Sequence, residues 1–124
     1  KTDGEPLNVR ICHCRTCQKA MGSPFYARAL FESRALAVEG DTAAYPSSET
    51  LERVFCKSCG TRLFSRRTNG TAVGVALAVF DDRNAFAPTE HIWVSEKIDW
   101  VRLDDGLPQH QHGLPKYPDT GPSS

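Results

Sequence analysis

Three of the five cysteines in this chain stand within six residues, as Cys12, Cys14 and Cys17. The other two form a second close pair, Cys56 and Cys59. Two cysteines that flank a single residue have poor geometry for a disulfide, and an odd number of cysteines does not make a disulfide framework. We therefore interpret both groups as metal ligands in a reducing compartment, which we expect to be the cytoplasm.

The first cluster predicts a zinc site with an open coordination position. Residues two apart on an extended segment share a face, so Cys12 and Cys14 point the same way and His13 points the opposite way. The turn that follows adds Cys17 as a third ligand. Three thiolates without an evident fourth ligand are typical of catalytic zinc, whereas structural zinc is closed by four ligands.

Two other interpretations of this cluster stay open. A structural zinc site would result if His13 or a distant residue supplied the fourth ligand. A metal-free redox pair would use Cys14 and Cys17, although the βαβ pattern that usually surrounds such a pair is absent.

The charge of the predicted site indicates its chemistry. Three thiolates more than neutralise Zn²⁺, so the ion is a weak generator of hydroxide. It is better suited to holding a substrate thiol as a thiolate, which stays nucleophilic toward an electrophile such as an aldehyde. The cluster therefore favours carbon–sulfur bond chemistry.

Short strands must position these residues. Alternating apolar positions and turn signals predict strands at 6–12, 25–31, 35–38, 50–55, 61–65, 71–80 and 91–94, with a helical turn at 16–21 and turns at 45–48 and 66–70. The fold class is therefore mostly β in one domain. We expect the packed domain to span residues 1–103 and residues 104–124 to form a coil-rich tail that packs on it or trails from it.

The overall charge argues against a general nucleic-acid binder. The chain has 124 residues, and its 15 basic residues equal its 15 acidic ones in number. No apolar run approaches the ~20 residues that span a bilayer, so we expect no membrane partner. The chain begins at Lys1 without a methionine, and we expect a further segment in front of it.

Several blocks of the sequence together resemble one known family. They are Cys-His-Cys-Arg-Thr-Cys-Gln-Lys at 12–19, Gly-Ser-Pro-Phe at 22–25, Phe-Cys-Lys-Ser-Cys-Gly-Thr-Arg-Leu-Phe at 55–64, His-Ile-Trp-Val-Ser-Glu-Lys-Ile-Asp-Trp at 91–100 and Gly-Leu-Pro at 106–108. In this order they are similar to the glutathione-dependent formaldehyde-activating enzyme family, also represented by centromere protein V. The resemblance implies small antiparallel sheets in a β-tent arrangement, with zinc-ribbon-like knuckles.

The resemblance also implies two metal sites. Cys12, Cys14 and Cys17 would hold the open zinc. Cys56 and Cys59 would supply half of a structural zinc site, which a Cys-x-Cys stretch before Lys1 would complete. We therefore expect one zinc ion in this chain, and two if that stretch is present in a longer chain.

The implied activity is that of a carbon–sulfur lyase of the S-hydroxymethylglutathione synthase type, which joins formaldehyde to glutathione. Glutathione carries two carboxylates and an ammonium group, so its site needs cationic anchors. We predict Arg15 and Lys19 as anchors, Ser23 as a donor to a substrate oxygen and Trp100 as a pocket wall. Solvated surface charge, a turn cap and core packing are the plainer alternatives for these residues.

Two other functions remain open at this point. A non-catalytic zinc-binding module would contact protein or nucleic acid through Arg66, Arg67 and the second cysteine pair. A metal carrier or sensor would exchange zinc with thiols. The sequence does not indicate an oligomeric state.

Overall fold

The structure is a computed structural model that describes residues 1–68 and 70–114. The described part is built mostly from strands: β1 (Asn8–Cys12), β2 (Tyr26–Glu32), β3 (Thr42–Pro46), β4 (Leu51–Cys56), β5 (Arg62–Arg67), β6 (Ala72–Ala76) and β7 (Glu90–Ile92). One α-helix, α1 (Arg15–Met21), follows β1, and three short 3₁₀ turns occupy Ser33–Ala35, Leu77–Val79 and Val94–Glu96. The predicted mostly-β, single-domain fold is confirmed.

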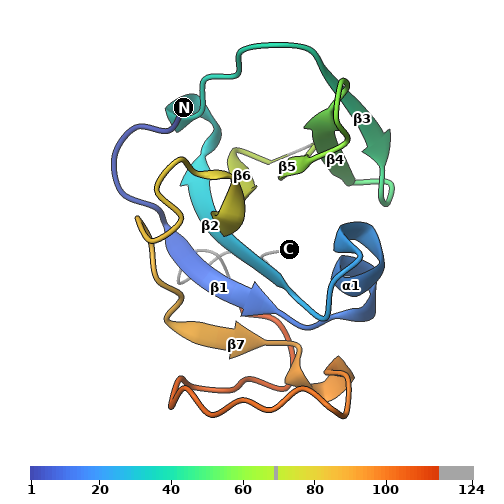
Figure 1. Cartoon of the computed structure of the whole chain (residues 1–124), viewed down its shortest axis with the longest axis vertical. Helices are drawn as coiled ribbons and strands as arrows, with labels where there is room; N and C mark the ends of the chain where they lie inside the picture. Colours follow the sequence, from blue (N-terminus) through green and yellow to red (C-terminus); the bar gives the residue numbers. More distant parts are fainter. Residues whose placement is uncertain (69, 115–124) are drawn as a thin grey trace.

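The strands form a single seven-stranded sheet in the order β3-β4-β5-β6-β2-β1-β7. The resemblance implies small antiparallel sheets in a β-tent, and the structure shows how the strands are joined. The sheet is continuous, and β1 pairs with β7 in parallel. Figure 1 shows the β3–β4 end of the sheet and β7 at opposite ends of the molecule, with α1 between them along the vertical axis.

Three of the predicted local elements differ from the observed ones. The predicted turn at 45–48 begins inside β3, an edge strand in which Pro46 is tolerated because edge positions need fewer hydrogen bonds. The predicted strand at 35–38 is instead a 3₁₀ turn followed by one isolated bridge, between Thr2 and Leu36. The predicted strand at 71–80 ends at Ala76. Asn69 of the predicted turn at 66–70 and the tail residues 115–124 lie outside the described residues.

The main core lies on one face of the central strands. It contains Val9, Ala29, Phe31, Val54, Phe64, Val73 and Val75. The Phe31 ring is fully buried and lies 5.6 Å from the ring of Phe86 and 6.2 Å from that of Phe80. A second cluster of buried residues includes two cysteines of the first group. It packs Cys12 and Cys17 together with Tyr26, Ala76 and Ile92. The candidate metal ligands are therefore part of a packed interior.

Gly74 on β6 gives the first testable prediction. A Cβ atom at this position would lie 2.8 Å from Cδ of the fully buried Arg28 and 3.3 Å from Oγ of Ser65. Because the Arg28 side chain is held at Asn8 by a 2.7 Å hydrogen bond, it cannot move aside freely. We expect Gly74→Ala to lower the free energy of unfolding by about 1–3 kcal/mol, as overpacking of a core does. Urea denaturation of both proteins would measure this, and unchanged stability would contradict it.

No helix in the described ranges is long and apolar enough to cross a membrane.

Candidate metal centre

The three clustered cysteines converge as their spacing predicted. The Sγ atoms of Cys12, Cys14 and Cys17 all lie within 4.8 Å of one another. Zinc–sulfur bonds of ~2.3 Å in a tetrahedron place sulfur atoms about 3.8 Å apart, so a small inward movement would complete the site. Cys12 and Cys17 are buried and Cys14 is partly exposed. The donor set and its spacing fit a zinc ion with one coordination position toward solvent.

Local structure brings the three sulfurs together. Cys12 ends β1 and pairs with Tyr26 and with Ile92, so two neighbouring strands fix its backbone. Cys14 is the N-cap of α1, where its Sγ accepts a hydrogen bond from the Cys17 backbone N–H at 3.3 Å. The helix ends at Gly22, whose left-handed backbone (φ 58°) suits glycine. The predicted helical turn at 16–21 is thus confirmed, with its start one residue earlier.

Hydrogen bonds among the thiols make Cys14 the preferred thiolate. The pKa of the Cys14 thiol is lowered because Cys12 and Cys17 hydrogen-bond to its sulfur and stabilise the ionised form. The pKa of the Cys12 thiol is raised by its hydrogen bonds to Cys14 and Cys17 and by burial. One sulfur of the cluster therefore carries negative charge readily, as a metal ligand must.

A buried arginine lies beside this charge. Arg53 on β4 is 4% exposed, and its Nη2 donates to Cys17 Sγ at 3.8 Å. Its Nε donates to Ser47 Oγ at 3.0 Å, and its guanidinium lies 5.9 Å from the centre of the Tyr26 ring. A fixed cation at this position offsets the negative charge of a three-thiolate site.

The cysteines open onto a pocket of about 310 Å³. Besides the three cysteines, it is lined by Thr16, Ser47, Ser48, Leu51, Arg53, Arg67, Trp93 and Glu96. These residues come from α1, from β4 and β5, from the turn between β3 and β4, and from the segment after β7. The volume lies at the lower end of the range, about 300–1,000 Å³, that holds small-molecule ligands.

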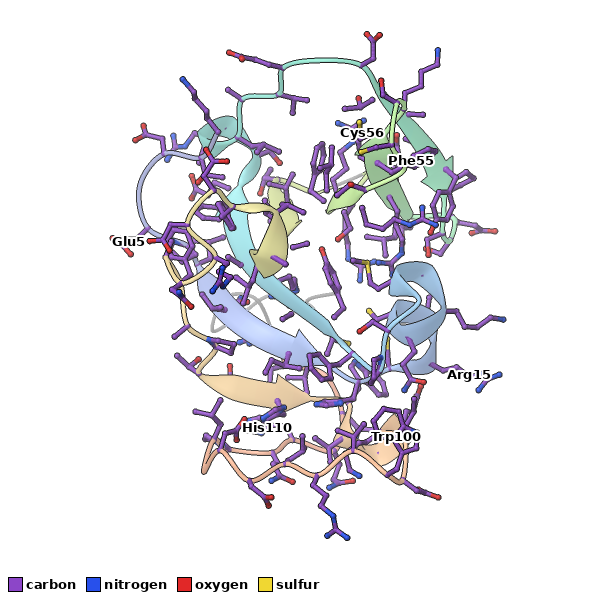
Figure 2. All side chains as sticks on the ribbon, viewed as in Figure 1. Glu5, Arg15, Phe55, Cys56, Trp100 and His110 are labelled. Carbon is purple, nitrogen blue, oxygen red and sulfur yellow. The ribbon has the colours of Figure 1, made fainter. Side chains whose placement is uncertain are left out.

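The predicted substrate residues lie outside the lining of this pocket. The Arg15 side chain points away from the protein in Figure 2, while its backbone N–H donates to Glu96 Oε1 at 2.8 Å. Lys19 is exposed, Ser23 is partly exposed at the end of α1, and Trp100 is 70% exposed. Their roles in substrate binding remain predictions.

The structure also assigns residues that sequence reasoning missed. Arg53, Arg67 and Ser47 line the pocket, but charged and hydroxyl residues in strands and turns usually face solvent. The signal that could have found Arg53 is alternation, because Leu51 and Arg53 share the face of β4 opposite to the core residue Val54. Trp93 also lines the pocket.

His13 is completely buried. Its Nε2 lies 2.9 Å from His91 Nδ1, and its ring contacts Phe25 with centroids 5.6 Å apart. Burial, followed by the charges of His91 and Lys97, lowers the pKa of His13 to about 4. His13 is therefore neutral near pH 7 and belongs to the support behind the cysteines.

The second cysteine pair occupies the predicted hairpin between β4 and β5. The backbone N–H of Gly60 donates to the Cys56 carbonyl at 2.8 Å, and Gly60 has a positive φ of 79°. Cys59 is exposed, and its sulfur lies 3.1 Å from Thr61 Oγ1. Figure 2 places Cys56 near the upper end of the molecule, away from β7. In the ranges that the structure describes, no third ligand joins this pair.

Trp93 gives the second testable prediction. It is the one non-glycine residue with positive φ (56°) in the described part of the chain, and its ring packs edge-on to His112. Left-handed backbone costs a residue with a Cβ about 1–2 kcal/mol, but glycine almost nothing. We expect Trp93→Ala to be less stable to urea than Trp93→Gly by about 1 kcal/mol, although both lose the same ring. Equal stabilities would show that the backbone is not strained.

Comparison with known proteins agrees with this geometry. The family model described as glutathione-dependent formaldehyde-activating enzyme matches residues 1–96 of the 124. Over 66 residues, the chain is also 41% identical to a Schizosaccharomyces pombe protein named as an uncharacterized lyase. That match covers 53% of this chain and 48% of the relative, so it spans about half the length of either protein. The extent of the family match shows that this chain belongs to the glutathione-dependent formaldehyde-activating enzyme family.

Proposed function

We propose that this chain is a zinc-dependent carbon–sulfur lyase that joins a small aldehyde, formaldehyde in the simplest case, to a thiol such as glutathione. One observation carries the proposal most directly: three cysteine sulfurs within 4.8 Å of one another line a pocket of ligand size. The family model's description and the name of the yeast relative support the same reaction class.

The reaction forms one carbon–sulfur bond. The thiolate sulfur attacks the carbonyl carbon, the carbon–oxygen π bond becomes an alkoxide, and the oxygen takes up the proton that the thiol released. The product is a hydroxymethyl thioether, and the reverse reaction releases the aldehyde. Zinc held by Cys12, Cys14 and Cys17 would supply the positive charge that keeps the substrate thiol deprotonated.

The other pocket residues suit a tripeptide thiol. Arg67 presents a cation to a substrate carboxylate, and Glu96 presents an anion to an ammonium group. Arg53, tied to Ser47 and to Cys17 Sγ, counters the charge that accumulates on the sulfur cluster. The indole of Trp93 offers an apolar wall for the substrate backbone. We assign these four residues to the substrate site because they line the pocket, whereas Arg15, Lys19, Ser23 and Trp100 lie outside its lining and stay predictions.

The test is to measure how fast glutathione and formaldehyde interconvert with their adduct, by NMR exchange, with and without the zinc-loaded chain. We expect faster exchange with the chain present, loss of the effect after chelation, and recovery on adding Zn²⁺. Zinc binding without any acceleration would contradict the enzyme and favour the non-catalytic zinc-binding module. Acceleration with another small thiol but not with glutathione would keep the lyase and change its substrate.

A further inference from the structure

A hydrogen-bonded chain runs from solvent to the residue between two of the metal ligands. Asp105 Oδ2 lies 2.7 Å from His91 Nε2, and His91 Nδ1 lies 2.9 Å from His13 Nε2. The Asp105 side chain is 42% exposed, whereas His91 is 2% exposed and His13 is fully buried. The inner end of this chain is the residue between Cys12 and Cys14.

The hydrogen-bond directions follow from the carboxylate. An ionised carboxylate only accepts, so His91 carries a proton on Nε2 and accepts at Nδ1. His13 then donates through Nε2, and its own Nδ1 is a buried acceptor without a hydrogen-bond partner among the described residues. The backbone N–H of His13 donates to the Ile92 carbonyl at 3.0 Å. The His13 carbonyl also accepts a 2.7 Å hydrogen bond from Gln18 Nε2. One ring bond and two bonds to the backbone therefore fix this residue.

The outer part of the chain belongs to the C-terminal segment. Asp105 Oδ1 accepts from the Leu107 backbone N–H at 3.0 Å. The His91 backbone N–H donates to the Pro108 carbonyl, and the His110 N–H donates to the His91 carbonyl, both at 2.9 Å. Figure 2 shows His110 beside β7. Residues 105–110 thus hold both the ring and the backbone of His91, although they lie beyond the residues 1–96 that match the family.

We propose that His13 is a positioning residue that sets the spacing of the Cys12 and Cys14 sulfurs, and that residues 105–110 act on the metal centre through His91. The inference rests on the proposed function only in that a metal binds the three cysteines. Because His13 lies between two ligands, a rotation of its peptide moves both sulfurs. Cysteines that are already held at the spacing a metal requires lose less conformational freedom when the metal binds. Residues that support metal ligands commonly contribute about 10- to 100-fold to metal affinity.

The test compares two amides at position 13. In His13→Gln the amide nitrogen reaches the position of Nε2 and keeps the bond to His91, whereas in His13→Asn it reaches only the position of Nδ1. We would measure Zn²⁺ and Co²⁺ affinity by chelator competition, and the visible spectrum of bound Co²⁺, on the whole 124-residue chain. We expect His13→Asn to bind metal about 10- to 100-fold more weakly than the wild type and to show an altered Co²⁺ spectrum. We expect His13→Gln to have nearly the wild-type metal affinity and Co²⁺ spectrum.

A second pair of variants applies if the buried substitution prevents folding. Asp105→Asn removes one of the two carboxylate oxygens that hold His91 and Leu107, and Asp104→Asn makes the same change at the exposed neighbour. We expect only Asp105→Asn to weaken Co²⁺ binding. Equal affinity and spectrum in the two aspartate variants, or in wild type and folded His13→Asn, would overturn the inference. Failure of the wild-type chain to bind either metal would instead contradict the proposed function.

Discussion

Replacing Cys14 by serine is expected to abolish zinc binding while leaving the fold intact. Serine is a good N-cap, so it keeps the hydrogen bond from the Cys17 N–H that begins α1. Its hydroxyl, however, is a poor zinc ligand, and the site drops to two thiolates. We expect zinc affinity to fall about a thousandfold or more, and the acceleration of adduct formation to disappear. Elemental analysis of chelator-free preparations would measure the bound zinc, and circular dichroism would show whether the fold is intact.

Cys59→Ser is the matched control for this experiment. Cys59 also belongs to a Cys-x-x-Cys pair, but it is exposed, and its sulfur lies 3.1 Å from Thr61 Oγ1. A serine hydroxyl keeps that contact. We expect this variant to retain the zinc of the first cluster and its activity. Equal zinc loss in both variants, or full zinc retention in Cys14→Ser, would contradict the three-cysteine centre.

Replacing Arg53 by methionine is expected to separate catalysis from metal binding. Methionine fills a similar volume but cannot donate to Cys17 Sγ or to Ser47 Oγ. A hydrogen bond from a charged group contributes about 1.5–3 kcal/mol, so kcat/KM should fall about 10- to 100-fold. All three thiolate ligands remain, and we therefore expect zinc to stay bound. Steady-state kinetics and elemental analysis of the same preparation would measure the two quantities.

Arg66→Met provides the control for the loss of a positive charge. Arg66 lies on β5 and pairs with Glu52 at 3.2 Å on the surface, outside the pocket lining. An exposed pair of this kind contributes only about 0–1 kcal/mol to stability. We expect its kcat/KM to equal that of the wild type. Equal falls in both variants would show that net charge, and not the position of Arg53, is responsible.

The cysteine cluster of the candidate metal centre could be predicted because its three residues are local. Cys12, Cys14 and Cys17 lie on one strand end and one helical turn, so sequence spacing alone determines how closely their sulfurs approach. The same holds for the hairpin of β4 and β5, where Gly60 supplies the positive φ that the turn needs. Ala29 and Phe31, two residues apart on β2, both belong to the main core, as the alternation of side chains along a strand requires.

The pocket around the metal could not be predicted in this way. Arg53 reaches Cys17 across 36 positions of sequence, and His13 meets His91 across 78. Contacts of that range depend on the strand order, which brings β4 and β7 to the cysteine cluster from opposite ends of the sheet. Sequence spacing contains no direct measure of strand order, so the sequence alone indicated anchors near the motif, such as Arg15 and Trp100, that lie outside the pocket lining.

The sequence by itself therefore determined which three cysteine sulfurs come together and which family the chain belongs to, because the approach of these sulfurs depends on residue type and local spacing. The tertiary structure decided which charges surround the sulfurs and which residues support them. Burial is the physical reason. The sequence of a strand does not show whether a charged or polar side chain faces solvent or a neighbouring element. Only packing shows that Arg53, His13 and His91 are removed from water.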